Sequence, residues 1–351
     1  MTMSEVGQGR LVASILEAMP DPVVVVDREL TVVMRNAAAA KTWPSLKPGK
    51  PLSFTLRAPA LIAAAQAASR GQGPVSDEYE ERVPVQRVFS FQASALPDGS
   101  EEHGGAPAAL IAFRDLTEAR RLEKMRVDFV ANASHELRTP LASLLGFVET
   151  LEGPAKNDPV ARERFLAIMR TQAQRMARLI DDLLSLSRIE MSEHRHPDAP
   201  VDIAAVARQV IDTLRPMADD KGVEIRLNAP DPVVVPGDRD ELQRVADNLV
   251  ENAIKYGQAG RRVDVTVDAV QEGGRPHGRL SVRDYGPGVA PADLPRLTER
   301  FYRAETSDKS GTGLGLALVK HIATRHRGRL SVESRKGEGA TFRVAIPQSA
   351  P

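Results

Sequence analysis

The 351-residue sequence contains no cysteine, which excludes disulfide bonds, thiol chemistry and cysteine-ligated metal sites. It also lacks net charge, because 47 Lys and Arg balance 47 Asp and Glu, so nothing in the overall charge favours nucleic acid or an anionic membrane as a partner. No apolar run approaches the ~20 residues that cross a bilayer, and the N-terminus lacks the basic and apolar segments of a signal peptide. We therefore expect a cytoplasmic protein with no direct nucleic-acid binding, and the length predicts two or three domains.

The first third of the sequence alternates short apolar segments with turns, which predicts a small α+β domain over residues 1–116. Asn36 is placed to cap an alanine-rich helix, and a second helix is expected at 61–68. Strands are predicted at 23–26, 31–34, 78–95 and 108–114. This order of elements resembles that of a PAS sensor domain.

A long helical pattern follows, and it carries the residue on which the functional interpretation depends. Its apolar side chains recur in steps of three and four, at Leu122, Met125, Phe129, Ala133, Leu137, Leu141, Leu144, Val148 and Leu151. His135 lies off this stripe, and Glu136 follows it directly. A carboxylate beside an imidazole fixes its tautomer and can take its proton, which makes the other ring nitrogen a nucleophile. Pro140 predicts a local kink. An exposed histidine on a helix is usually an ordinary surface residue, so only the rest of the chain can decide its role.

A second long helix is expected after the turn at residues 153–159, with an apolar stripe that reaches about Ile189. Two such helices form an antiparallel hairpin over residues 117–192. The apolar surface of one hairpin is too wide to remain exposed to water, so two copies should assemble into a four-helix bundle. The sequence therefore predicts a homodimer. Asp181 and Asp182 are expected on a solvated face. Residues 193–201 are expected to be a linker.

Residues 202–351 alternate helices and strands, with one helix expected at 239–256, which predicts a two-layer α/β sandwich. Asn248 and Asn252 stand four residues apart and therefore share one helical face, and amide oxygens suit Mg²⁺. Asp284 ends a strand in the run Asp284-Tyr285-Gly286-Pro287-Gly288. A buried carboxylate there can accept a hydrogen bond from the amino group of adenine.

Further along, the pattern indicates a site for phosphate. Phe301-Tyr302-Arg303 supplies an aromatic anchor and a cation, and Gly311-Thr312-Gly313-Leu314-Gly315 leads into a helix whose free N–H groups suit phosphate oxygens. A last glycine-containing turn, residues 337–342, leads into the final strand. The Rossmann and Walker motifs are both absent: no Lys-Ser/Thr pair follows the glycines, and no strand-GxGxxG-helix opening occurs.

Each motif is weak alone, but their order and spacing resemble the N, G1, F, G2 and G3 boxes of the GHKL-type ATP-binding fold. The stretch around His135 resembles the H box of sensor histidine kinases, and this resemblance covers residues 115–347. Ser310 departs from it, since these kinases often have glycine there. Within the family, residues 129–189 resemble the phosphate-regulon sensor kinases. The implied fold class is multidomain α+β: a PAS-like sensor over 1–116, a helical hairpin of a dimeric four-helix bundle over 117–192, and a GHKL α/β-sandwich domain over 202–351.

The resemblance implies ATP-dependent phosphorylation of His135 and transfer to an aspartate of a response regulator, in a phosphate-starvation response. Glu136 would orient the imidazole and accept its proton, and Thr139 would position water for a phosphatase activity. ATP and Mg²⁺ are the implied cofactors, with Asn252 and Asn248 on the metal. The implied ATP-binding residues are Asn248, Asn252, Lys255, Tyr256, Asp284, Gly286, Gly288, Arg303, Gly311, Thr312, Gly313, Leu314, Gly315 and Thr341.

Two alternatives stay open at this point. One is a GHKL ATPase whose hydrolysis drives a conformational change, which explains the C-terminal motifs but gives His135 and Glu136 no task. The other is a non-catalytic scaffold that acts through dimerisation and its PAS-like domain. A membrane transporter or an accessory regulator is left open as a further partner, which would recruit the protein to a membrane.

Overall fold

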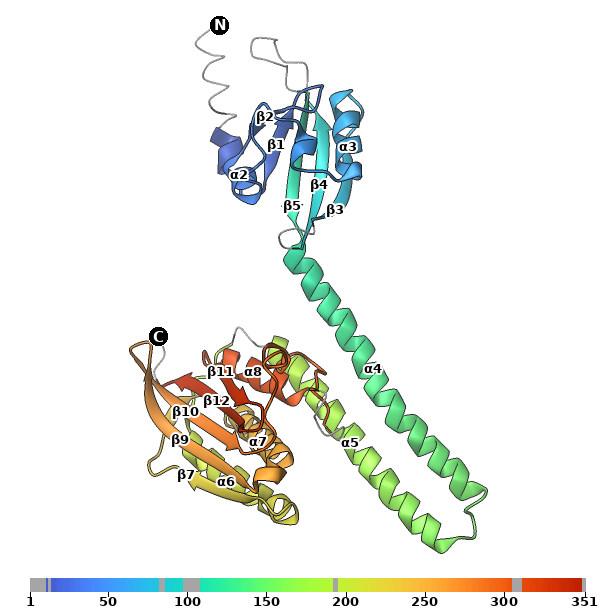
Figure 1. The fold of residues 1–351 in the computed structure, drawn as a ribbon, viewed down its shortest axis with the longest axis vertical. Helices are drawn as coiled ribbons and strands as arrows, with labels where there is room; N and C mark the ends of the chain where they lie inside the picture. Colours follow the sequence, from blue (N-terminus) through green and yellow to red (C-terminus); the bar gives the residue numbers. More distant parts are fainter. Residues whose placement is uncertain are drawn as a thin grey trace. The chain divides into compact units, whose positions relative to one another are not determined.

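The structure is a computed structural model that describes residues 11, 14–81, 86–96, 108–191, 195–304 and 311–348 (Figure 1). The chain forms two compact units, Met1–Asp128 and Phe129–Pro351, each with its own α and β elements. The division falls inside one long helix, α4 (Thr117–Glu152). The predicted multidomain α+β class is therefore confirmed.

The N-terminal unit is a five-stranded antiparallel sheet in the order β2-β1-β5-β4-β3. The strands are β1 (Val23–Val26), β2 (Val32–Arg35), β3 (Val75–Glu81), β4 (Arg87–Ala95) and β5 (Ala109–Asp115), and the helices are α2 (Ala37–Thr42), the short 3-10 helix η1 (Leu52–Phe54) and α3 (Pro59–Ser69). The side chain of Asn36 accepts a hydrogen bond from the N–H of Ala39 at 2.9 Å, which confirms it as the cap of α2. The elements appear in the predicted order, and the PAS assignment stays a prediction.

Only Leu116 separates β5 from α4, and both sides of this junction are hydrogen-bonded. The N–H of Leu116 donates to the carbonyl of Val88 at 2.8 Å, and the N–H of Val88 donates to the hydroxyl of Thr117 at 3.0 Å. Arg120, at the end of the first turn, pairs with Glu78 of β3 at 2.9 Å. The first turn of α4 is therefore fastened to the sheet, with no flexible linker between them.

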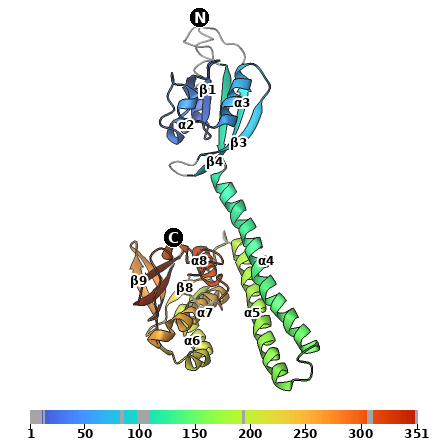
Figure 2. The same cartoon turned by 45° about the vertical axis from the view of Figure 1, so that its right-hand side comes forward.

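In the second unit, α4 and α5 (Pro159–Met191) form a hairpin whose turn occupies residues 153–158 (Figure 2). The carboxylate of Asp158 caps α5 by accepting hydrogen bonds from the N–H groups of residues 160 and 161. The helix α4 continues through Pro140, and the kink expected there stays a prediction. Within the described residues, no helix combines the length and the apolarity needed to cross a membrane.

Exposed large apolar side chains recur along the hairpin within Phe129–Pro351, at Val130, Leu141, Leu145, Val148, Val160, Leu166, Ile180, Leu184 and Met191.

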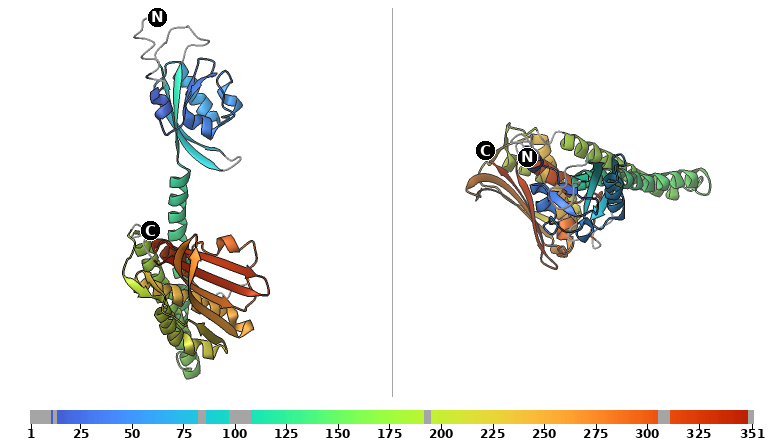
Figure 3. Two further views of the ribbon diagram at one scale, coloured as in Figure 1. Left: turned by 90° about the vertical axis from the view of Figure 1, so that its left-hand side faces the viewer. Right: turned by 90° about the horizontal axis from the view of Figure 1, so that it is seen from above.

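The rest of the second unit is a five-stranded sheet in the order β11-β12-β10-β9-β7, with β7 and β9 parallel and the other neighbours antiparallel. Its strands are β7 (Glu224–Asn228), β9 (Arg262–Glu272), β10 (Arg275–Asp284), β11 (Arg329–Arg335) and β12 (Gly339–Pro347). Three helices, α6 (Ile203–Asp220), α7 (Arg239–Tyr256) and α8 (Gly315–Arg325), cover one face of this sheet (Figure 3). This arrangement is the predicted two-layer sandwich, and α7 has the predicted bounds.

Two details differ from the sequence expectation. The predicted linker ends in a strand, because β6 (Pro200–Asp202) pairs with β8 (Val234–Pro236); residues 192–194 lie outside the described part of the chain. In addition, Leu179, Leu186 and Ile189 of α5 are buried in the same core as the sandwich. The hairpin therefore shares one hydrophobic core with the C-terminal domain through α5.

Candidate active site

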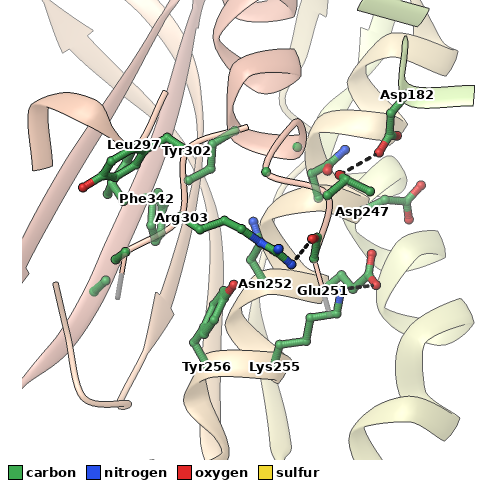
Figure 4. A pocket seen from close by; sticks show the side chains of 18 of the residues that line it. Asp182, Asp247, Glu251, Asn252, Lys255, Tyr256, Leu297, Tyr302, Arg303 and Phe342 are labelled. Carbon is green, nitrogen blue, oxygen red and sulfur yellow. Dashed lines mark hydrogen bonds and ion pairs between the residues drawn. The ribbon is translucent and has the colours of Figure 1, made fainter. Parts of the chain in front are cut away.

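A pocket of about 650 Å³ lies between α5, α7 and the loop that leads into α8. Figure 4 shows Leu297 and Phe342 on one side of it and Asp182, Asp247 and Glu251 on the other. Asn252, Lys255, Tyr256 and Arg303 lie between these two ends. The pocket therefore has one largely apolar end and one end rich in charge.

The end of β10 supplies a buried carboxylate to this pocket. Asp284 is only 4% exposed and accepts a hydrogen bond from the N–H of Gly286 at 2.9 Å. Burial raises the pKa of Asp284, although hydrogen bonds from the backbone oppose the shift. A Cβ on Gly286 would lie 2.1 Å from the carbonyl oxygen of Tyr256, so glycine is required where β10 meets the end of α7. The carboxylate is thus an anchored acceptor for a polar hydrogen of a ligand.

The glycine-rich loop is held against the segment that carries Phe301 and Arg303. The N–H of Phe301 donates to the carbonyl of Gly313 at 2.9 Å, and the guanidinium of Arg303 donates to the carbonyl of Gly311. Gly313 has φ +71°, and a Cβ there would lie 2.8 Å from the backbone of Phe301. Ser310 lies outside the described residues.

The first residue of α8, Gly315, packs directly on Asn248 of α7. A Cβ on Gly315 would lie 2.3 Å from Oδ1 of Asn248, and the Nδ2 of the same amide donates to the carbonyl of Arg244 at 2.8 Å. The amide of Asn248 is therefore fixed by α7 on one side and by the start of α8 on the other.

The charged end of the pocket offers oxygen donors that fit Mg²⁺. Asn248 and Asn252 contribute amide groups, and Asp247 and Glu251 contribute carboxylates. Among the described residues there is no group of three or more His, Asp or Glu side chains that could hold a metal ion by themselves. Such a sparse oxygen set suits Mg²⁺, which keeps several waters and is completed by phosphate oxygens.

Two cations at this end, Lys255 and Arg178, face the same carboxylate, that of Glu251. Nζ of Lys255 lies 2.6 Å from Oε1 of Glu251, and the same oxygen lies 3.8 Å from Nη1 of Arg178. Glu251 therefore links α7 to α5 at the charged end of the pocket.

Four α5 residues line the pocket, namely Arg175, Arg178, Asp181 and Asp182, and the sequence interpretation did not place them there. Asp182 was expected on a solvated face, but its Oδ2 accepts a hydrogen bond from the hydroxyl of Thr312 at 3.1 Å (Figure 4). Burial raises the pKa of Asp182, opposed by this hydrogen bond. Arg175 and Arg178 precede it by seven and four residues, a spacing that puts all three on one helical face. That spacing was the available signal, but periodicity alone does not say what covers a face.

The predicted catalytic residues lie on α4. His135 is exposed, in agreement with the sequence, and the hydroxyl of Thr139 donates to its carbonyl at 3.3 Å. The carboxylate of Glu136 faces Arg175, with Oε2 3.5 Å from Nη2. Because Arg175 also lines the pocket, a single ion pair connects the neighbour of His135 to the pocket wall.

Three of the predicted ATP-binding residues do not line the pocket. Gly286 lies behind Asp284 against the backbone of Tyr256, and Leu314 is fully buried in the core. Thr341 alternates with Ala340 and Phe342, which do line the pocket, so its side chain points to the opposite face of β12. The other predicted residues border the pocket, namely Asn248, Asn252, Lys255, Tyr256, Asp284, Gly288, Arg303, Gly311, Thr312, Gly313 and Gly315.

Two family models match most of the chain from residue 125 onwards. Residues 125–192 match the "His Kinase A (phospho-acceptor) domain", and residues 237–350 match the "Histidine kinase-, DNA gyrase B-, and HSP90-like ATPase". The first match contains His135, and the second contains most of the pocket.

Curated relatives extend this similarity over nearly the whole chain. The phosphate regulon sensor protein PhoR of Pseudomonas aeruginosa is 35% identical over 331 residues, which are 93% of this chain and 71% of the relative. The sensor histidine kinase WalK of Bacillus subtilis is 30% identical over 351 residues, which are 97% of this chain but only 56% of the relative.

Solved structures show the same fold. The histidine kinase AdeS of Acinetobacter baumannii aligns with a TM-score of 0.50 and 28% identity, over 62% of this chain and 98% of that one. The histidine kinase ThkA, solved in complex with the response regulator protein TrrA, aligns over 96% of this chain and 98% of its own, with a TM-score of 0.50 and 18% identity.

Proposed function

Because this chain belongs to the sensor histidine kinases of two-component systems, we propose that it transfers the γ-phosphoryl group of ATP to His135 and then to an aspartate of a response regulator. The observation that carries this proposal is the ion pair between Glu136 and Arg175, which joins the histidine segment to the wall of the pocket. A pocket for ATP alone would need no such connection.

The adenine base is assigned to the end of the pocket that holds Asp284. Its carboxylate, buried and fixed by the N–H of Gly286, would accept a hydrogen bond from the exocyclic amino group of adenine, which guanine lacks at that position. Leu297 and Phe342 supply the apolar surface for the ring.

The phosphates are assigned to the charged end. Lys255 and Arg303 would neutralise phosphate charge, and Asn252 and Asn248 would hold Mg²⁺. When bound, Mg²⁺ would neutralise phosphate charge that otherwise repels a nucleophile. The N–H groups at the start of α8 are available to a phosphate oxygen.

In the transfer step, a ring nitrogen of His135 attacks the γ-phosphorus in line. The N–P bond forms as the bond between the γ-phosphorus and the β,γ-bridging oxygen breaks, ADP leaves, and Glu136 takes the ring proton. In the second step, a carboxylate oxygen of the response regulator displaces the imidazole. We further propose that Thr139, exposed one turn beyond His135, positions water for the reverse phosphatase reaction.

A homodimer is part of this proposal. The exposed apolar side chains of α4 and α5 give two hairpins a surface to bury, and burial of apolar area drives such association. The similarity to PhoR favours the phosphate-starvation response as the pathway.

The decisive experiment is incubation with γ-labelled ATP and Mg²⁺. We expect label that is stable to alkali, labile to acid and absent from His135→Gln. Asn252→Ala should abolish labelling as well, because the metal loses a ligand. Label that survives His135→Gln would refute the assignment of the phosphoacceptor, and steady phosphate release without a phosphoprotein would favour the ATPase alternative.

A further inference from the structure

Two arginines of α5 pair with carboxylates on neighbouring helices. Arg175 pairs with Glu136 of α4 at 3.5 Å, and Arg178, one turn later, pairs with Glu251 of α7 at 3.8 Å. Both arginines also line the pocket. The face of α5 thus carries two cations that can exchange a carboxylate partner for a ligand in the pocket.

The pair between Arg175 and Glu136 is loose. Its N···O distance of 3.5 Å exceeds the 2.7–2.9 Å that is typical of a charge-assisted hydrogen bond. The two side chains are 30% and 35% exposed, so water screens their attraction. A guanidinium in such a pair can be drawn away by a stronger anion.

The terminal phosphate of a triphosphate is such an anion. It carries more negative charge than one carboxylate, and its oxygens match the planar guanidinium in a two-pronged contact. With adenine beside Asp284, the terminal phosphate faces the end of the pocket that α5 and α7 enclose. A diphosphate lacks this group and does not extend as far.

We propose that Arg175 responds to the γ-phosphate and thereby controls Glu136. Without a terminal phosphate, Arg175 holds the carboxylate of Glu136. When the γ-phosphate arrives, Arg175 turns to it, and Glu136 is released to accept the proton of His135. Arg175 forms and breaks no covalent bond; it contacts the substrate and positions Glu136. This inference rests on the proposed function.

The test compares the affinities of the full-length protein for ADP and for a non-hydrolysable ATP analogue, both with Mg²⁺. In Arg175→Gln we expect the affinity for the analogue to fall about tenfold, as for loss of one charge-assisted contact, with the affinity for ADP within twofold of the original. Arg175→Lys should recover part of the loss. The matched control is Arg170→Gln, an exposed arginine on the same helix outside the pocket, which should change neither affinity.

Competition between Glu136 and the phosphate gives a second, opposite signature. Glu136→Gln should raise the affinity for the analogue several-fold and leave that for ADP unchanged, because Arg175 no longer has a competing partner. The gain should vanish in the double variant with Arg175→Gln. If Arg175 had a purely structural role, its loss would weaken the binding of both nucleotides alike. That result, or an unchanged ratio of the two affinities, would overturn the inference.

The two hypotheses fail in different ways. If the unaltered protein binds no ATP or acquires no label on His135, the proposed function is wrong. If it binds and labels normally but the ratio of the two affinities does not respond to Glu136→Gln or Arg175→Gln, only the role of Arg175 is wrong.

Discussion

Because Gly315 contacts Asn248, adding one methyl group at residue 315 should change the rate of autophosphorylation without changing the stability of the fold. A Cβ at residue 315 would lie 2.3 Å from Oδ1 and 3.3 Å from Cγ of Asn248, whereas ordinary contact begins at 3.4 Å. In Gly315→Ala the amide oxygen must therefore move by about 1 Å. Moving it means rotating the amide, which breaks the hydrogen bond from Nδ2 to the carbonyl of Arg244.

The expected result is a large loss of rate with little loss of stability. Displacement of a catalytic group by about 1 Å can lower a rate by about 100-fold. The clash involves the end of a side chain and not the backbone, and alanine favours a helix over glycine by up to about 1 kcal/mol. We therefore expect autophosphorylation of Gly315→Ala to fall about 100-fold, with a melting temperature within a few degrees of the original.

A double-mutant cycle tests whether the effect acts through Asn248. If it does, Gly315→Ala in the background of Asn248→Ala should cause almost no further loss, because the displaced group is already absent. Gly73→Ala, where a Cβ has no neighbour within 4 Å, controls for the glycine substitution itself. Additive losses in the cycle, or a normal rate in Gly315→Ala, would refute the reasoning.

Two further predictions concern buried titratable groups. Burial raises the pKa of Asp284, so ionisation of this carboxyl costs stability once the pH rises above 3.8, the ordinary pKa of the group. In thermal unfolding without nucleotide, Asp284→Asn should therefore melt at a higher temperature than the unaltered protein at pH 7, and the difference should shrink towards pH 4. The same variant should bind ATP about 10- to 100-fold more weakly, as expected for loss of a hydrogen bond to a charged group, and unchanged binding would contradict the adenine assignment. Burial also lowers the pKa of His326, whose Nε2 accepts from the N–H of Asp238 at 3.0 Å and whose Nδ1 bonds to the carbonyl of Ile322 at 2.8 Å, with Glu241 and Arg325 beside it. The unfolded chain therefore binds a proton on the His326 imidazole more readily than the folded chain, so stability should decrease as the pH falls below 6.5, by at most about 1.4 kcal/mol per pH unit. In urea unfolding between pH 7 and pH 5, the free energy of unfolding should depend less on pH in His326→Gln than in the unaltered protein.

The elements that could be predicted from the sequence are those with local signals. Helix α7 has the bounds expected from the sequence, and its buried apolar side chains follow one stripe. In the structure the carboxylate of Asp238 caps it by accepting hydrogen bonds from the N–H groups of Asp240 and Glu241. Asp284 was expected to be buried because it ends an apolar strand, and the structure agrees.

What could not be predicted depends on which surfaces meet. The position of Asp182 against Thr312 requires knowing that α5 packs on the loop before α8, and no local pattern contains that information. Strand β6 has three residues, too few for an alternating pattern to be recognised. The orientation of Thr341, by contrast, follows from strand alternation, because a residue between Ala340 and Phe342 points to the face opposite theirs.

The junction at Leu116 has a consequence for the phase of α4. Since the first turn is fastened to the sheet through Val88 and Glu78, the direction in which each side chain of α4 up to Asp128 points is set by the number of residues counted from that junction. Each added residue would rotate the downstream side chains by about 100° and advance them by about 1.5 Å, and about seven would nearly restore the original facing. The length of this segment is therefore constrained in steps of the helical repeat, even where the identity of its exposed residues is not.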